Sequence, residues 1–291
     1  MFGSIGFGFM KASFGESETT HDSTIEAIHE AMRQGVTLFD TADIYAPSWN
    51  TMGHNELLLA EAISTFEGKT EPLLIATKGG ITRGTGEAWG RNANLEYLQS
   101  AVEASAKRLN VSKIPLWQHH RLDPNLPFET QLENLATLKQ NGLIERIGVS
   151  NYSAKQLRRA IEVIGDIASV QNQLNPAYRQ DLDVLAVCEE HGIVFLPWSP
   201  TKGARQNDAQ AIIKTIADEK QASTYAVAIT WLRSLSTQLV PIPGVTRKES
   251  VEDALSSLKL DLNSEDLKRI NEGLEPTQPM DAELLSDQPK N

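Results

Sequence analysis

Short apolar runs alternate with longer amphipathic stretches along this chain, and this alternation restricts the fold more than any other feature. The runs are apolar at most positions rather than at every second one, which is typical of parallel strands buried on both faces. The predicted strands are Ile5–Phe9, Val36–Asp40, Leu73–Lys78, Ile114–His120, Ile144–Ser150, Ala168–Gln171, Ile193–Trp198 and Leu239–Ile242. The predicted helices are Ser23–Gln34, Glu56–Phe66, Leu95–Leu109, Phe128–Gln140, Ala154–Ile164, Leu182–His191, Ala222–Leu235 and Ser250–Leu258.

Eight strand–helix units in about 260 residues predict an α/β fold of the (β/α)8 TIM-barrel type. A doubly wound sheet has the same alternation. Its glycine-rich dinucleotide fingerprint is missing, however, because Gly6–Gly8 is not followed by a third glycine at the required spacing. Two extra helices are predicted, at Asn207–Lys220 and Ser264–Glu272. We expect one domain over residues 1–291, with a short, loosely ordered C-terminal tail at residues 276–291.

The charge balance argues against several classes of partner. The chain has 27 Lys+Arg and 38 Asp+Glu, so its net charge is −11. An acidic surface repels phosphate and anionic lipid, so neither nucleic acid nor a membrane is an expected partner.

The single cysteine, Cys188, excludes an internal disulfide and a multi-cysteine metal site, and no metal site is predicted. No apolar run approaches the roughly 18 residues of a membrane span, and no signal peptide is recognisable, so we expect a cytoplasmic protein.

Polar residues end the predicted strands, where packing alone would favour apolar ones. In a barrel of this type the active site lies at the carboxyl ends of the strands, so these residues are predicted to share one site. They are Asp40, Lys78, His119, His120, Ser150, Asn151, Gln171, Trp198 and Ser199.

A proton donor can be assembled from part of this set. An aspartate beside a lysine keeps the lysine charged, and a nearby ammonium lowers the pKa of a tyrosine phenol. Tyr45, in the loop after Asp40, could then give a proton to a carbonyl oxygen while a histidine orients the substrate. Each residue alone has a structural explanation: Asp40 could cap a helix, Lys78 could lie at a surface turn, and either histidine could belong to the core. Only the combination favours a site.

The order and spacing of these motifs resemble the aldo-keto reductase family over nearly the whole chain, from Gly6 to about Ile270. In that family the functional histidine precedes Arg-x-Asp-Pro, which selects His120 over His119. The segments that carry the resemblance are Gly35–Tyr45, Ala76–Lys78, Leu116–Pro124 and Gly148–Tyr152.

The resemblance implies a barrel that binds NAD(P)H in extended form without a Rossmann domain. It implies hydride transfer to an aldehyde, ketone or sugar carbonyl, with Tyr45 as the general acid. Lys78 and Asp40 would tune Tyr45, and His120 would position and polarise the carbonyl. This agrees with the physical argument, because hydride addition develops negative charge on an oxygen that a phenol backed by an ammonium can stabilise.

The resemblance also implies a cofactor site. Ser150, Asn151 and Gln171 would hold the carboxamide of the nicotinamide, and Trp198 would stack on its ring. Residues implied at the phosphates and the adenosine are Ser199, Pro200, Thr201, Pro243, Gly244, Val245, Thr246, Arg247, Lys248, Ser250 and Asp253. NADPH is the expected cofactor, with NADH possible.

The chain departs from the family pattern at three positions. Ser250 stands where an arginine or another hydrogen-bonding residue is frequent, Ala254 where an asparagine is frequent, and Ala46 where glycine is usual. Contact with the 2′-phosphate of NADPH is therefore expected from Arg247, Lys248 and the hydroxyl of Ser250.

The substrate is a small carbonyl compound that the sequence does not specify further. Trp49, Trp89 and Arg121 are candidates for its pocket, although Arg121 could instead pair with Asp123. Two other functions remain open. One is an NADP(H)-binding, redox-sensing regulatory subunit of the same fold. The other is a Schiff-base lyase that uses Lys78 as nucleophile, which a neighbouring aspartate disfavours because it keeps the lysine protonated.

Overall fold

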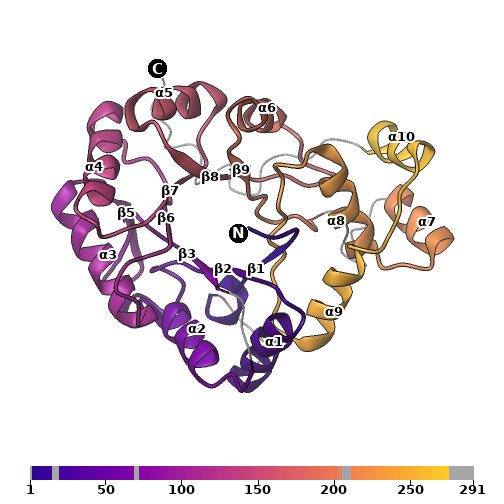
Figure 1. Ribbon diagram of the computed structural model, residues 1–291, viewed down its shortest axis with the longest axis horizontal. Coiled ribbons are helices and arrows are strands. Elements are labelled where there is room, and N and C mark those ends of the chain that lie inside the picture. Colours follow the sequence, from indigo (N-terminus) through magenta and orange to yellow (C-terminus); the bar gives the residue numbers. More distant parts are fainter. Residues whose placement is uncertain (1, 15–19, 69–71, 203, 205–210, 275–291) are drawn as a thin grey trace.

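The computed structural model describes residues 2–14, 20–68, 72–202, 204 and 211–274. The predicted tail at residues 276–291 lies outside the described residues, as do the first residues of the helix predicted at 207–220. Figure 1 shows a curled sheet surrounded by helices.

The sheet contains seven parallel strands in the order β1-β2-β3-β6-β7-β8-β9. Seven of the predicted strands are therefore present, most of them shorter than predicted. Their bounds are β1 (Gly6–Gly8), β2 (Leu38–Asp40), β3 (Leu74–Gly79), β6 (Leu116–His119), β7 (Ile147–Ser150), β8 (Ile167–Gln171) and β9 (Val194–Phe195).

The predicted eighth strand, Leu239–Ile242, is not a regular strand of the sheet, yet its segment lies between the two edge strands. Leu239 forms a parallel bridge with Phe195 of β9, and Gly244 forms one with Gly8 of β1. Prolines explain the irregularity, because Pro241 and Pro243 have no N–H to donate to a strand ladder. Their carbonyls still accept hydrogen bonds from the amides of Gly6 (2.9 Å) and Gly8 (3.0 Å). This arrangement is consistent with a (β/α)8 barrel.

The helices match the predicted ones closely. Four have the predicted bounds: α3 (Leu95–Leu109), α4 (Phe128–Gln140), α5 (Ala154–Ile164) and α6 (Leu182–His191). The others are α1 (His21–Arg33), α2 (His54–Ser64), α7 (Ala211–Lys220), α8 (Thr224–Leu235), α9 (Lys248–Ser256) and α10 (Ser264–Gly273), with short 3-10 turns η1 (Met10–Ala12) and η2 (Trp49–Thr51). Helix α1 begins earlier than predicted because Thr20 rather than Ser23 is the N-cap, its hydroxyl accepting from the Ser23 amide.

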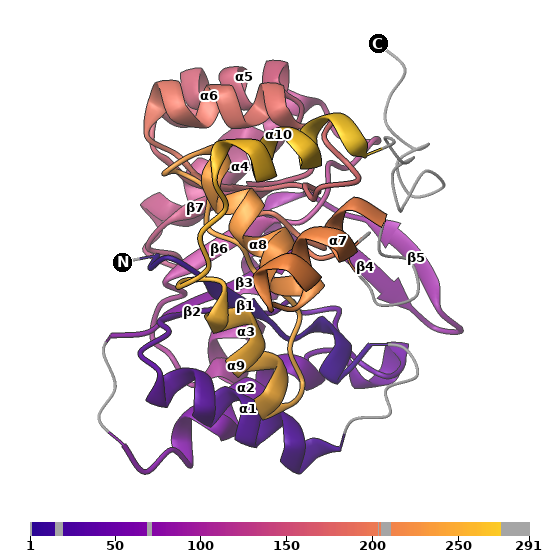
Figure 2. The same cartoon turned by 90° about the vertical axis from the view of Figure 1, so that its right-hand side faces the viewer.

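An antiparallel hairpin that the sequence did not predict follows β3. It consists of β4 (Ile81–Gly84) and β5 (Ala88–Arg91), with Arg83 directly opposite Trp89. Figure 2 shows the hairpin extending beyond the ring of strands. The hairpin lies next to the carboxyl ends of the strands, so it can form one wall of a site located there.

The two faces of the strands have different roles. Phe39 of β2 and Trp117 of β6 are fully buried in the large core between strands and helices. Leu38, Leu74 and Leu116 belong to a separate apolar cluster inside the ring. Because side chains alternate along a strand, the residues two positions further along these strands also point inward. Those residues are Asp40, Ala76 and Gln118. Asp40 and Gln118 are polar, and Lys78 lies two positions beyond Ala76, so the interior becomes polar toward the strands' carboxyl ends.

Two features are absent from the described residues. None of the described helices is long and apolar enough to span a membrane. The same part of the chain contains no group of His, Cys, Asp and Glu arranged to hold a metal ion.

Candidate active site

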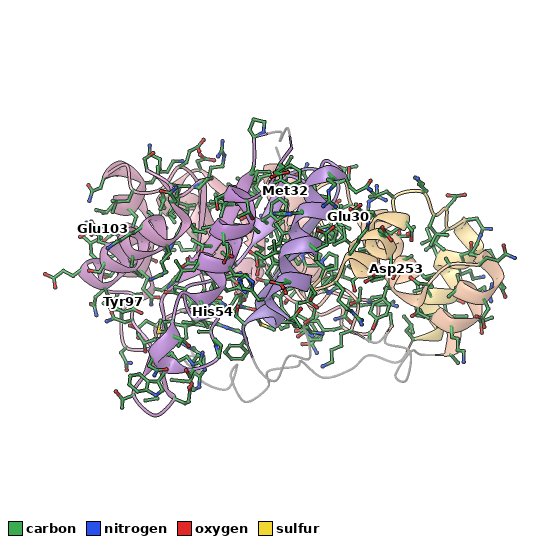
Figure 3. The ribbon with its side chains drawn as sticks, turned by 90° about the horizontal axis from the view of Figure 1, so that it is seen from below. Glu30, Met32, His54, Tyr97, Glu103 and Asp253 are labelled. Carbon is green, nitrogen blue, oxygen red and sulfur yellow. The ribbon has the colours of Figure 1, made fainter. Side chains whose placement is uncertain are left out.

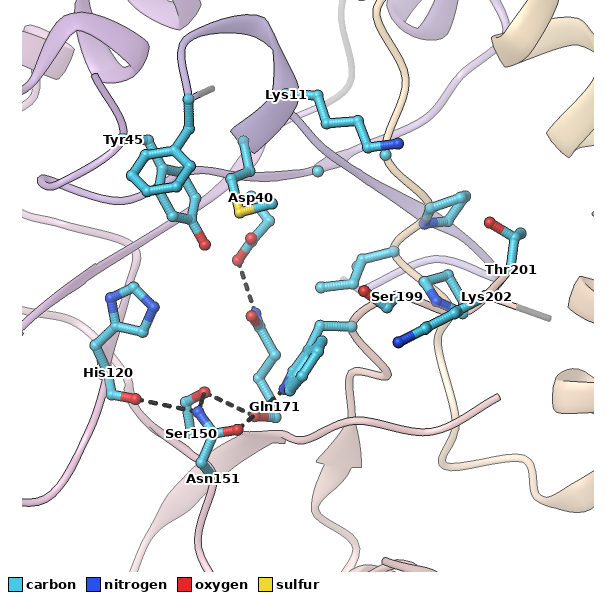
Figure 4. A pocket seen from close by; sticks show the side chains of 18 of the residues that line it. Lys11, Asp40, Tyr45, His120, Ser150, Asn151, Gln171, Ser199, Thr201 and Lys202 are labelled. Carbon is cyan, nitrogen blue, oxygen red and sulfur yellow. Dashed lines mark hydrogen bonds between the residues drawn. The ribbon is translucent and has the colours of Figure 1, made fainter. Parts of the chain in front are cut away.

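A cavity of about 1190 Å³ opens at the carboxyl ends of the strands. It collects most of the predicted site residues, some of which appear in Figure 4. Those lining it are Asp40, Tyr45, Trp89, His120, Arg121, Ser150, Asn151, Gln171, Trp198, Ser199, Pro200, Thr201, Pro243, Gly244, Val245, Thr246, Arg247, Ser250 and Asp253. Three residues with a predicted role are not part of this lining, namely Lys78, Trp49 and Lys248, and neither is the strand-end residue His119.

Lys78 lies just beneath the cavity in a buried ion pair. Its Nζ donates to Asp40 Oδ2 at 2.6 Å and to the carbonyl of Thr41 at 2.8 Å. The side chains of Lys78 and Asp40 are 1% and 5% exposed. Burial alone would lower the pKa of Lys78, but the carboxylate of Asp40 and the phenol of Tyr45 outweigh it, so this pKa is raised. Lys78 is therefore a fixed positive charge at neutral pH.

Tyr45 lies against this ion pair. Lys78 Nζ is 5.1 Å from the centre of the phenol ring, so the ammonium charge acts on the phenol at close range. Burial raises the pKa of Tyr45 while Lys78 lowers it, and the net result is a raised pKa. The predicted lowering by Lys78 is thus present, but burial dominates. The phenol keeps its proton at neutral pH, which is the state a general acid requires.

The two adjacent histidines at the carboxyl end of β6 point in different directions. His120 lines the cavity, and its ring meets that of Tyr45 edge-on at 5.9 Å. Burial, followed by the positive charges of Lys78 and Arg121, holds the pKa of His120 well below its usual value, so the imidazole is neutral. Its Nδ1 is buried and has no hydrogen-bond partner among the residues that the structure describes. His119 instead points into the core, where its Nδ1 contacts the hydroxyl of Tyr152 at 2.9 Å.

Ser150, Asn151 and Trp198 form a connected group of polar atoms on another side of the cavity. Asn151 Nδ2 donates to Ser150 Oγ at 2.8 Å, and Trp198 Nε1 donates to Asn151 Oδ1 at 3.1 Å. Asn151 has a φ of 61°, in the left-handed region that asparagine tolerates better than most residues. The carbonyl of Gln171 accepts a hydrogen bond from Ser150 Oγ at 2.7 Å, which joins this group to β8.

The lining of the cavity is basic although the protein is acidic. Five lining residues carry a positive charge, namely Lys11, Arg91, Arg121, Lys202 and Arg247, against two carboxylates, Asp40 and Asp253. One of these carboxylates, that of Asp40, is compensated by Lys78 at 2.6 Å. The described part of the cavity therefore suits an anionic ligand.

The two adjacent basic residues after the last predicted strand, Arg247 and Lys248, lie in different surroundings. Arg247 lines the cavity, whereas Lys248 Nζ lies 3.7 Å from Glu30 of α1 and 3.8 Å from Glu252 of α9. Figure 3 shows Glu30 on α1 beside the helix that carries Asp253. Of the two, only Arg247 is placed to meet a ligand in the cavity.

The substrate candidates also differ in position. Trp89 lines the cavity and packs edge-on against Phe14 with ring centres 5.9 Å apart. Arg121 lines the cavity too and is 8% exposed. Trp49 lies in η2, where its amide donates to Glu87 Oε1 at 2.9 Å, away from the described lining.

Two features of the site went unnoticed at the level of sequence. Gln118 Nε2 donates to Asp40 Oδ1 at 3.1 Å, and Gln171 Nε2 donates to the same oxygen at 2.8 Å, so Asp40 is held from three sides. The alternation along β6 could have indicated Gln118, because it lies two positions before His120 and thus on the same face. The basic residues Lys11 and Lys202 follow β1 and β9 and carry no motif that would have singled them out.

The comparisons with known proteins agree with one another. The model of the "Aldo/keto reductase family" matches residues 4–275. An uncharacterised oxidoreductase of Schizosaccharomyces pombe is 30% identical over 271 residues, which are 92% of this chain and 85% of that protein. A thermostable aldo-keto reductase solved with the inhibitor epalrestat is 26% identical with a TM-score of 0.75, covering 92% of this chain and 94% of the other. A Klebsiella pneumoniae aldo/keto reductase, solved with NADP and acetate, has 21% identity and a TM-score of 0.76, covering 95% and 93%.

Proposed function

Because this chain belongs to the aldo-keto reductase family of NAD(P)H-dependent oxidoreductases, we propose that it is an NADPH-dependent carbonyl reductase with Tyr45 as general acid. The observation that carries the proposal is the buried contact chain from Asp40 through Lys78 to Tyr45, which ends beside the neutral ring of His120. We further propose that the chain is a single domain whose sheet is completed to a (β/α)8 barrel by residues 239–244.

The residues of the cavity fit a bound nicotinamide dinucleotide. The volume of about 1190 Å³ exceeds the roughly 300–1,000 Å³ of ordinary small-ligand pockets, so a dinucleotide and a small substrate can share it. Ser150, Asn151 and Gln171 offer hydroxyl and amide groups for the carboxamide, and Trp198 offers an indole face. The positive charges of Lys202 and Arg247 suit the phosphates.

When bound, the reduced nicotinamide would supply a hydride to the carbonyl carbon of the substrate. Tyr45 would hold the carbonyl oxygen with its hydroxyl and give it the phenolic proton as negative charge develops there. The positive charge of Lys78 would stabilise the phenolate that remains, because the two groups are already in contact in a buried environment. Asp40 keeps Lys78 charged and in place.

His120 would act as a hydrogen-bond donor rather than as a charged acid. Because its pKa is lowered, the imidazole is neutral and carries one ring N–H. This N–H can orient the carbonyl oxygen by a hydrogen bond, while Tyr45 remains the group that gives up a proton. The unpartnered Nδ1 of His120 marks a buried polar atom that a bound substrate or water would satisfy.

The rival functions have less support. Lys78 is a poor nucleophile for a Schiff-base lyase, because it is protonated and its Nζ already donates to Asp40 and Thr41. No comparison supports a redox-sensing subunit, and no observation of the described residues favours one.

A substrate panel tests the proposal. We expect the purified protein to oxidise NADPH in the presence of at least one class among aldehydes, ketones, ketosugars and quinones, and to do so stoichiometrically with alcohol formation. Failure to turn over any carbonyl, combined with tight NADPH binding, would contradict the reductase assignment and favour a binding role.

A further inference from the structure

Arg83 is a buried cation in a hairpin whose other residues are largely accessible. It is 8% exposed, while Trp89, opposite it on β5, is 46% exposed. Burying a guanidinium is costly unless its donors and its charge are compensated. The partners of Arg83 therefore indicate why the position is charged.

Those partners are the backbone on both sides of Tyr45. Arg83 Nη1 donates to the carbonyl of Ala46 at 2.7 Å and to that of Ile44 at 3.3 Å, and Nη2 donates to the carbonyl of Pro47 at 3.3 Å. Nε pairs with Glu87 Oε2 at 2.5 Å, at the tip of the hairpin. One guanidinium thus ties the loop of the proposed general acid to β4 and β5.

The guanidinium also lies close to two aromatic rings. Its central carbon is 4.9 Å from the ring of Trp89 and 5.2 Å from the ring of Phe14. Phe14 in turn packs against Tyr45, with ring centres 6.4 Å apart. Trp89, Phe14 and Tyr45 all line the cavity, whereas Arg83 is not among the described lining residues.

We propose that Arg83 is a positioning residue that fixes the loop of Tyr45 against the Trp89 wall of the substrate pocket. The proposal rests on the proposed role of Tyr45. Arg83 does not touch the reacting atoms; it acts by holding three carbonyls around the tyrosine while lying against two aromatic rings. A planar guanidinium can do both at once, and an ammonium cannot.

The test uses Arg83→Gln, Arg83→Lys and the control Glu87→Gln. Small displacements of catalytic groups cost up to about a hundredfold in rate, so we expect kcat to fall about tenfold or more in Arg83→Gln. The kcat of Arg83→Lys should fall nearly as far, although this variant keeps the positive charge. The affinity for NADPH should change less than about threefold in both. Glu87→Gln keeps the carbonyl contacts and an acceptor for the Trp49 amide, so its kcat should stay near that of the unmodified protein.

Hydrogen–deuterium exchange of the peptide spanning residues 41–55 provides a second measurement that does not depend on turnover. Exchange should accelerate in Arg83→Gln and Arg83→Lys, with unchanged circular dichroism, and stay normal in Glu87→Gln. Unchanged kcat in both Arg83 variants would overturn the proposal, and so would a reduced kcat without faster exchange. If instead the unmodified protein reduces no carbonyl, or Tyr45→Phe remains active, the failure lies with the proposed function rather than with Arg83.

Discussion

At the scale of single residues, the proposed chemistry depends on charges placed where water cannot screen them. Lys78 is 1% exposed and Asp40 is 4% exposed, so their attraction is much stronger than at a surface. Asp40 is held by Lys78, Gln118 and Gln171 together, which fixes the ammonium relative to Tyr45. The sequence indicated Asp40, Lys78 and Gln171 but assigned no role to Gln118, because the contact of Gln118 with Asp40 joins residues that are 78 positions apart in the chain.

Arg247 and Lys248 offer a matched pair for testing cofactor choice. Only Arg247 lines the cavity, so Arg247→Ala should weaken NADPH binding about tenfold, the lower end for a charge-assisted hydrogen bond at an exposed residue. NADH, which lacks the 2′-phosphate, should be affected less than about threefold. Lys248→Ala should alter neither, because Lys248 faces Glu30 and Glu252. Isothermal titration of both nucleotides measures these affinities.

Two results of that titration would refute the role of Arg247. One is an equal loss of NADH and NADPH affinity in Arg247→Ala. The other is a loss in Lys248→Ala as large as that in Arg247→Ala.

Arg121 can be tested with a pair of substrates. It lines the cavity beside His120 and contributes to lowering the pKa of that histidine, so its charge is felt at the reacting centre. We expect Arg121→Gln to raise the KM of a benzaldehyde carrying a carboxylate by about tenfold. The KM of the corresponding methyl ester should change little. Equal effects on acid and ester, measured by NADPH oxidation, would argue against a role for Arg121 in substrate binding.

At the scale of elements, the apolar runs predicted the strands of the sheet because each strand is buried on both faces. The same reasoning missed the hairpin β4–β5, since its sequence is polar and glycine-containing and gains its order from contacts of Arg83 with a distant loop. It also predicted a regular strand at Leu239–Ile242, where Pro241, and Pro243 directly after it, interrupt the hydrogen-bond ladder. The hydrophobic pattern therefore predicted the strands that are buried on both faces. It did not predict the hairpin, whose conformation depends on contacts with a distant loop.

The buried side chain of His119, at the end of β6, should make the stability of the protein depend on pH. Burial lowers the pKa of His119 to about 4, below its ordinary value of about 6.5. Between these values the unfolded chain binds a proton that the folded chain does not, so stability falls as the pH falls through this window. The burial of His120 acts in the same direction, while the raised pKa of buried Asp43 acts in the opposite one.

We therefore expect the stability of His119→Gln to fall less steeply than that of the unmodified protein between pH 6.5 and pH 4. The difference in the free energy of unfolding should be up to about 1 kcal/mol per pH unit, and it should appear as a smaller loss of Tm. Glutamine has both a donor and an acceptor, so it can still form the hydrogen bond with the hydroxyl of Tyr152. The exposed His191 is the control, and His191→Gln should keep the original profile. An unchanged slope in His119→Gln, measured by thermal melts across this range, would show that His119 is not the sensor.

At the scale of the whole molecule, an acidic protein surrounds a basic cavity. The net charge is −11, yet basic residues outnumber acidic ones among the described residues that line the cavity. The cavity is lined by residues from β1 to α9, including the carboxyl ends of β7 and β8, so a ligand in it contacts elements that are far apart in the sequence. Binding should therefore stabilise the entire fold rather than one loop.

NADPH should raise the melting temperature of the protein. Ligand at a hundred times its Kd adds about 2.7 kcal/mol to the free energy of unfolding. For a domain of this size that corresponds to a shift of about 5 °C or more. NADH at the same concentration should give a smaller shift if the 2′-phosphate is recognised. A melting temperature that does not respond to either nucleotide would contradict the assignment of the cavity as the cofactor site.

The most direct measurement of the central claim is the turnover of Tyr45→Phe. This change removes the phenolic oxygen but keeps the ring that contacts Phe14 and His120, so the fold and NADPH binding should persist. If Tyr45 is the general acid, NADPH-dependent carbonyl reduction should fall by about 10²–10⁴-fold with nearly unchanged NADPH affinity. Turnover within about threefold of the unmodified protein would contradict the account and move the proton donor elsewhere in the cavity.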